Sequence, residues 1–179
     1  MNKTKLIIDF YGGLGCGKLT AAAYVFASLK MKGIDCEMTS EFAKDKVWEG
    51  NLDTLKRCQF YVTGCQAYRV MRLFNKVNVI VNDSPIASGA AYADYPELAV
   101  TCIAESRKYK DLTRSYFLKR PESFDINGRQ FNKNESINFD EKIKKILKDN
   151  DIEYKDCNYT KYSLDKIVDE TIEFLKAEN

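Results

Sequence analysis

The segment from Gly12 to Lys18 carries the residue types best suited to binding phosphate. It reads Gly-Gly-Leu-Gly-Cys-Gly-Lys and matches G-x-x-x-x-G-K, between an apolar run and a helical pattern. Glycines let backbone amides crowd around phosphate oxygens, a helix N-terminus adds partial positive charge, and Lys18 reaches the outer phosphates. The phosphate-binding residues predicted from this motif are Gly12, Gly13, Gly15, Cys16, Gly17, Lys18, Leu19 and Thr20.

The residue after the lysine departs from the usual phosphate loop. Leu19 stands where Ser or Thr normally holds Mg²⁺, and Thr20 lies about 100° further round the helix. Asp83, at the end of a predicted strand, supplies the carboxylate for metal or for the attacking hydroxyl, and is the predicted metal ligand. The alternative is that Asp83 only forms an Asx turn before Pro85.

Other polar residues suggest an acceptor site. Glu41 follows a predicted strand, at the edge of the sheet where ligands bind, although it also suits a solvated helix start. Gln59, Gln66 and Arg69 share one face of a predicted long helix and suggest substrate recognition, unless that face meets solvent.

Two arginines flank a polar, turn-rich segment. Arg120 and Arg129 are predicted to act in catalysis by neutralising charge on the phosphates, and residues 119–136 are predicted to form a lid. Surface arginines without a catalytic task are the alternative.

Apolar periodicity predicts alternating strands and helices. This pattern indicates an α/β fold with a mostly parallel sheet and right-handed crossovers. The predicted strands are Leu6–Tyr11, Ile34–Thr39, Val77–Val81, Ser115–Leu118 and Ile152–Tyr154. The predicted helices are Lys18–Lys32, Asn51–Lys76, Glu97–Lys108, Glu141–Lys148 and a last helix capped by Ser163.

Composition narrows the choice of function. The 179 residues suit one domain, 1–179, and a net charge of +2 indicates neither a general nucleic-acid binder nor a membrane-surface protein. There is no histidine, which excludes Ser-His-Asp and Cys-His triads. The six cysteines form no C-x-x-C pair and indicate reduced thiols in the cytoplasm.

Several blocks of sequence carry a family resemblance. They are Phe10–Ala22, Thr39–Glu49, Val79–Pro85, Phe117–Arg120 and Asn127–Arg129, which together span nearly the whole chain. In these blocks the sequence resembles the phage-type P-loop kinases grouped with NadR-like AAA ATPase domains.

The resemblance implies a P-loop NTPase, nucleotide-kinase-like three-layer fold with a lid. It also implies ATP at Lys18, an acceptor near Glu41, a metal or acceptor role for Asp83, and contact of Arg129 with the transferred phosphoryl group. By the same resemblance the chain works in the cytoplasm of a phage-infected host.

We therefore expect an ATP- and Mg²⁺-dependent kinase acting on a small nucleotide, with a deoxynucleoside monophosphate as the first acceptor to test. One alternative is a nucleotide-binding regulator that lost turnover through Leu19. Another is a polynucleotide 5′ kinase, which the near-neutral charge disfavours. No membrane partner is expected, and a homodimer is left open.

Overall fold

A single parallel sheet organises the chain. The computed structural model describes residues 3–120 and 133–178. For residues 133–135 it describes the backbone only. The sheet has five strands in the order β2-β3-β1-β4-β5, and each neighbouring pair is parallel. The strands are β1 Leu6–Tyr11, β2 Cys36–Thr39, β3 Val79–Asn82, β4 Thr113–Lys119 and β5 Lys155–Asn158.

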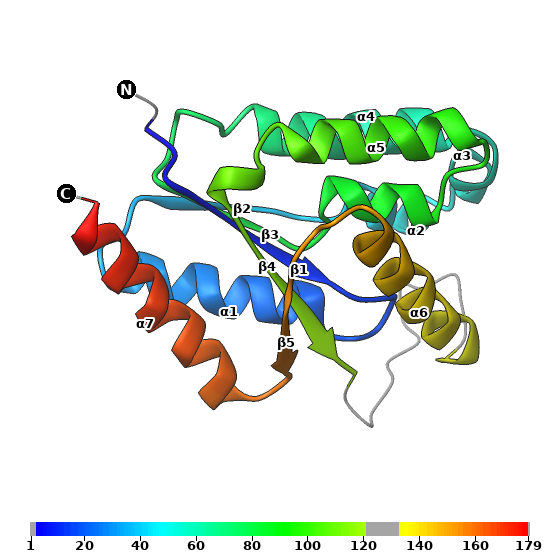
Figure 1. Cartoon of the computed structure of the whole chain (residues 1–179). Coiled ribbons are helices and arrows are strands. Elements are labelled where there is room, and N and C mark those ends of the chain that lie inside the picture. Colours follow the sequence, from blue (N-terminus) through cyan, green and yellow to red (C-terminus); the bar gives the residue numbers. More distant parts are fainter. Residues whose placement is uncertain (1–2, 121–132, 179) are drawn as a thin grey trace.

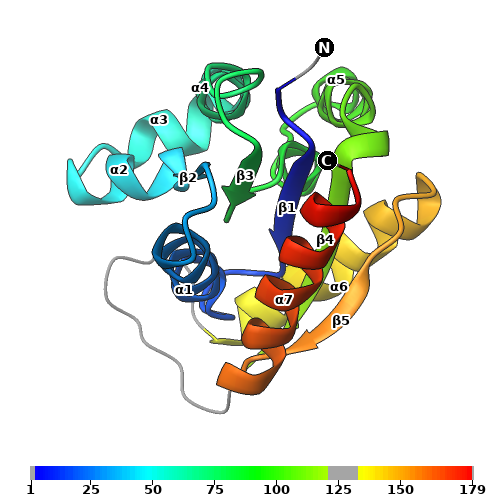
Figure 2. The same cartoon turned by 90° about the vertical axis from the view of Figure 1, so that its left-hand side faces the viewer.

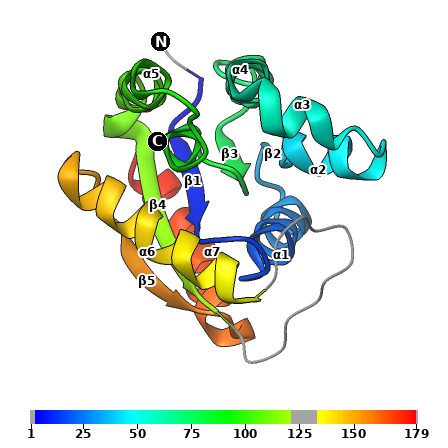
Figure 3. The same cartoon turned by 90° about the vertical axis from the view of Figure 1, so that its right-hand side faces the viewer.

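Helices cover both faces of this sheet. Figures 1 and 2 show α1 and α7 on one side and α4 and α5 on the other, and Figure 3 shows α6 lying over β4. The α-helices are α1 Lys18–Met31, α2 Phe42–Trp48, α3 Leu52–Arg57, α4 Gln59–Met71, α5 Pro96–Arg107, α6 Lys133–Asp149 and α7 Lys161–Ala177. Two 3₁₀ helices, η1 Ile86–Ala91 and η2 Lys110–Leu112, complete the described elements.

Strand β1 is buried along its whole length because helices pack on both of its faces. Ile8 and Phe10 join the core beneath α1 and α7. Ile7 and Tyr11 point to the opposite face, where α4, α5 and α6 supply the packing. Asp9 lies on that second face, a carboxylate in the middle of a buried strand.

The structure corrects several predicted boundaries. The long helix expected over Asn51–Lys76 is interrupted at Cys58, where φ is −142°, and so forms α3 and α4. Helix α2 and η1 were not anticipated. The prediction of a strand at Ile152–Tyr154 is wrong, because β5 begins only at Lys155.

The cap predicted for the last helix is also wrong. Thr160, not Ser163, caps α7, and the Thr160 side-chain oxygen accepts a hydrogen bond from the Ser163 backbone N–H at 3.3 Å. The apolar pattern begins only at Leu164, so it gives no signal for a cap as early as Thr160.

Of the predicted lid at 119–136, the structure describes the two ends. Lys119 ends β4, and Lys133 begins α6. Arg129 lies outside the described residues. Across the described ranges, no helix is both long and apolar enough to span a membrane.

Candidate nucleotide site

The phosphate loop joins the carboxyl end of β1 to the first turn of α1. Gly17 precedes the helix with φ of 94°, and no side chain caps this helix end. The first amides of a helix have no partner within the helix, so here they face the loop uncapped. Backbone N–H groups and the positive end of the helix dipole are therefore available to an anion.

Lys18 begins α1 and turns back over the loop. Its Nζ donates to Gly12 O at 2.8 Å and to Gly13 O at 3.1 Å. An ammonium group has three N–H donors, so one remains for a ligand without breaking either contact.

Helix α6 and the end of β4 hold the other side of the loop. Gly13 N donates to Asp140 Oδ1 at 2.5 Å, and Arg120 donates to Asp140 Oδ2 through Nη2 at 2.6 Å and through Nε at 3.1 Å. Arg120 also donates to Leu14 O at 2.6 Å. Because the ion pair is almost fully buried, with 10% and 11% of the side chains exposed, it positions the loop firmly.

Two loop glycines are required by their surroundings. A Cβ on Gly13 would lie 2.5 Å from Ser136 O, and one on Gly17 would lie 2.5 Å from the Tyr159 ring. The positive φ of Gly17 adds strain for any other residue. These glycines therefore allow α6 and the β5–α7 turn to approach the loop.

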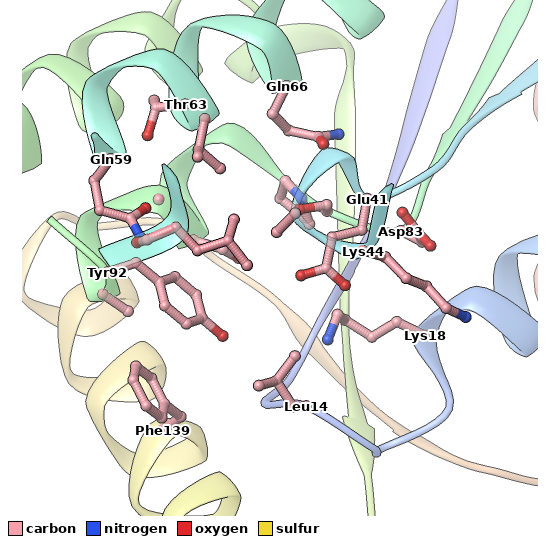
Figure 4. A pocket seen from close by; sticks show the side chains of 18 of the residues that line it. Leu14, Lys18, Glu41, Lys44, Gln59, Thr63, Gln66, Asp83, Tyr92 and Phe139 are labelled. Atoms are coloured by element: carbon pink, nitrogen blue, oxygen red, sulfur yellow. The ribbon is translucent and has the colours of Figure 1, made fainter. Parts of the chain in front are cut away.

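A cavity of about 540 Å³ opens beside the phosphate loop. Figure 4 shows that Lys18, Glu41, Lys44 and Asp83 gather at one end, and that Tyr92 and Phe139 stand at the other. Gln59, Thr63 and Gln66 from α4 and Ser88 from η1 also line the cavity.

Unsatisfied polar atoms gather at this cavity. Within the described residues, three buried side-chain polar atoms lack a hydrogen-bond partner: Gln66 Nε2, Asp83 Oδ1 and Ser88 Oγ. All three residues line this cavity. Since buried polar groups are nearly always paired in folded proteins, the three together suggest the outline of an absent polar ligand.

Asp83 lies where β3 ends and is only 2% exposed. Burial, reinforced by the negative charge of Glu41, raises its pKa to about 7, while Lys18, Lys44 and Arg69 oppose this shift. The site thus brings two carboxylates into electrostatic contact beside cationic groups. This arrangement can bind a metal ion or accept a proton.

The opposite end of the cavity is aromatic. The Tyr92 and Phe139 rings stack with centroids 4.7 Å apart and planes 16° apart. Lys142 donates from α6 to Ala91 O and so ties this end of the cavity to η1. Aromatic faces of this kind stack against flat apolar groups.

The predicted recognition residues separate into two groups. Gln59 and Gln66 line the cavity, where Gln66 Oε1 accepts from Phe42 N at 2.8 Å and leaves its amide N–H₂ free. Arg69 is not among the lining residues. It donates to Ser40 O at 2.9 Å and pairs with Asp45, and it thereby braces the turn after β2.

Arg120 is occupied by the Asp140 and Leu14 contacts described above, so in this conformation its guanidinium supports the loop. Sequence reasoning missed Ser88, Tyr92, Phe139 and Lys142 as lining residues. The Pro85-Ile86-Ala87-Ser88-Gly89-Ala90-Ala91 run offered a signal, since small residues allow a 3₁₀ segment to lie close under a cavity.

The donor set suits Mg²⁺, with a gap at Leu19. Asp83 offers a buried oxygen without a partner, and Leu19 offers no ligand atom. Mg²⁺ keeps several waters and binds to few protein groups, so one carboxylate and the phosphates of a nucleotide can hold it. No group of three or more potential metal-ligating side chains occurs in residues 3–120 and 133–178.

Comparisons with known proteins address the fold. No protein-family model and no curated protein sequence matches the chain. Among solved structures, it is similar to YorR protein from Bacillus subtilis in complex with phosphorylated GDP, with TM-score 0.57 and 15% identity over 96% of each chain. It is also similar to a deoxyadenosine kinase from M. mycoides with dCMP and dCDP bound, with TM-score 0.55 and 14% identity over 94% of this chain and 100% of that one.

At these identities the similarity concerns the backbone arrangement alone. The parallel sheet, its helices on both faces and the glycine-rich loop before α1 agree with that similarity. The chain has the α/β P-loop NTPase fold.

Proposed function

We propose that the protein transfers a phosphoryl group from ATP to a small nucleotide, with a deoxynucleoside monophosphate as the first acceptor to test. The observation that carries this proposal is a single cavity with two ends. The phosphate loop and Lys18 border one end, and the stacked Tyr92 and Phe139 rings border the other. Such a cavity suits two ligands that meet near Asp83.

At the phosphate-loop end of the cavity, backbone amides and positive charge would bind ATP. The uncapped start of α1 offers amides to the β- and γ-phosphates, and the Lys18 ammonium, held over the loop, adds a positive charge. When Mg²⁺ binds, it neutralises charge on the transferred group, and in this chain Asp83 and the nucleotide phosphates would hold it.

At the aromatic end of the cavity, the shape of the wall and its hydrogen-bonding groups would bind the acceptor. The ring pair gives a surface for a nucleobase, and the free amide group of Gln66 offers a donor in the cavity wall. Lys44 provides positive charge for an acceptor phosphate beside Asp83 and Glu41. Catalysis would then come mainly from positioning and electrostatics, as expected for phosphoryl transfer.

A coupled assay over a panel of nucleosides and nucleoside monophosphates tests the proposal. We expect ATP- and Mg²⁺-dependent product with at least one acceptor, and a loss of about 1,000-fold or more in kcat/KM for Lys18→Ala, because the phosphates lose the positive charge of Lys18. Lys176→Ala removes an exposed lysine on α7 and serves as the matched control. Equal transfer by Lys18→Ala and the wild type would contradict the proposal.

Leu19 favours a second candidate, a nucleotide-binding regulator without turnover. It predicts tight ATP binding that is indifferent to Mg²⁺, with no product from any acceptor. Calorimetry with ATP, with and without Mg²⁺, separates the two functions. A kinase should bind ATP more tightly with the metal and should form product.

A further inference from the structure

A second cavity, of about 660 Å³, lies on the face of the sheet that carries the odd-numbered residues of β1. Ile7, Asp9 and Tyr11 line it from β1, together with Asn82 from β3 and Ser115 from β4. Its rim is formed by the end of α5, by η2 and by the turn between α6 and β5. Lys18, Glu41 and Asp83 do not line it, and Ile86 is the one described residue that lines both this cavity and the candidate nucleotide site.

Asp9 is the chemically unusual group in this cavity. It is only 8% exposed, and its Oδ1 accepts from Asn82 Nδ2 at 2.8 Å. No described residue donates to the other carboxylate oxygen, Oδ2, although Asp9 lines the open space. A carboxylate has room for about four hydrogen bonds, so most of its capacity is unused.

Among the described residues, no cation compensates the charge of Asp9. Burial raises its pKa to about 7, and the hydrogen bond from Asn82 opposes this shift. The charged side chains that line the cavity lie on the outer elements and are of both signs: Arg107, Lys110, Asp111, Asp151 and Glu153. The apolar side chains of Ile7, Val70 and Ile86 also line the cavity.

We propose that this cavity binds a small organic cation with an amidine or primary amine group, whose N–H donors pair with Asp9 while its apolar body packs on Ile7, Val70 and Ile86. A buried carboxylate without an ion-pair partner attracts such a group, and an N⁺–H to O⁻ contact is about twice as strong as a neutral hydrogen bond. The volume exceeds the needs of a bare metal ion, and the apolar wall favours an organic ligand.

Occupancy of this cavity reaches the nucleotide site through Asn82. The same side chain donates to Asp9, and its Oδ1 accepts from Thr39 Oγ1 at 2.8 Å and from Ser84 N at 3.2 Å. A ligand that donates hydrogen bonds to Asp9 therefore changes the hydrogen bonding at the turn that carries Asp83. This linkage can be observed at Ser84 whether or not the protein is a kinase.

Benzamidine titrated into the full chain at pH 8 tests the proposal by NMR. We expect saturable shifts of residues around Asp9, with the Ser84 amide moving along the same curve. Asp9→Asn should weaken binding at least about tenfold because the charge is lost. Asp156→Asn, which changes an exposed carboxylate on β5, should bind like the wild type.

Benzamide, the neutral analogue, repeats the comparison in the unchanged protein and should also bind at least about tenfold more weakly. This second arm holds even if Asp9→Asn does not fold. No saturable binding of benzamidine, equal binding of benzamide, or shifts confined to the residues around Lys18 and Asp83 would overturn the proposal.

Discussion

Asp9 and Asp83 are two buried carboxylates that differ in what surrounds them. Asp9 pairs in register with Asn82, so Asp83 lies only one residue beyond the same rung of the sheet. Burial is the largest cause that raises each pKa to about 7. Lys18, Lys44 and Arg69 oppose the shift at Asp83, whereas among the described residues Asn82 alone favours ionisation of Asp9.

The difference follows from position along the strand. Asp83 stands past the end of β3, where the loop after β1 and the turn after β2 bring cationic side chains to the same edge. Asp9 stands inside β1, where its register partners on the neighbouring strands are Asn82 and Ser115, an amide and a hydroxyl. Burial therefore raises the pKa of both carboxylates, but only at Asp83 do lysines oppose that shift.

The largest expected effect is the loss of turnover when Asp83, but not Asp9, is replaced. We expect Asp83→Asn to lower kcat by about 100-fold or more, because the metal and the acceptor lose an anionic ligand. Asp9→Asn should lower kcat by less than about tenfold, since Asp9 reaches the nucleotide site only through Asn82. Steady-state assays with the acceptor found in the panel measure both, with Asp156→Asn as the control. Equal losses for the two variants would contradict the distinction.

The pH dependence of stability should show what the two carboxylates share. Because each folded-state pKa is raised from 3.8 to about 7, the folded protein binds these protons more tightly than the unfolded chain does. The free energy of unfolding should therefore fall between about pH 4 and pH 7 and change little above it through these groups. Asp→Asn at either position should remove part of this fall, on the order of 2 kcal/mol between pH 5 and pH 8.

Urea unfolding of the wild type and both variants at pH 5 and pH 8 measures this effect. The variants should match the wild type most closely at pH 5 and exceed its stability at pH 8. A wild type that gains stability over this range relative to both variants would show that the carboxylates are ionised and well paired in the folded state.

The smallest effect should come from restoring a metal ligand beside Asp83. Leu19→Ser adds a hydroxyl at the start of α1, and we expect the Mg²⁺ concentration for half-maximal activity to fall several-fold. Leu19→Ala is the control, since it shortens the side chain without adding an oxygen. The same metal response in both variants would argue against a role of this position in metal binding.

Much of the fold was predictable from the chain itself. The apolar run of β1, the phosphate motif and the alternation of strands and helices were sufficient for the α/β architecture. The break between α3 and α4 at Cys58 was not predictable, because the apolar spacing continues across Cys58 while the backbone turns there. The β5 boundary failed because only Cys157 of that strand is buried, so an exposed edge strand leaves little apolar pattern.

The site was predictable where chemistry is local and unpredictable where it depends on packing. Lys18, Glu41 and Asp83 follow strand ends, and the structure brings them to one cavity together with Gln59 and Gln66. Tyr92 and Phe139 come from distant segments, and only their stacking reveals the aromatic end. The catalytic roles predicted for Arg120 and Arg129, and the substrate-binding role predicted for Arg69, stay predictions.

The contacts of the phosphate loop with Ser136, Asp140 and Tyr159 bear on how the protein matures. The loop is made from residues near the start of the chain, yet partners more than 100 positions later complete its shape. During synthesis the first helix can form early, but the loop gains these contacts only after α6 and the turn after β5 have emerged. A chain stopped before those segments would carry the full motif and lack its supports.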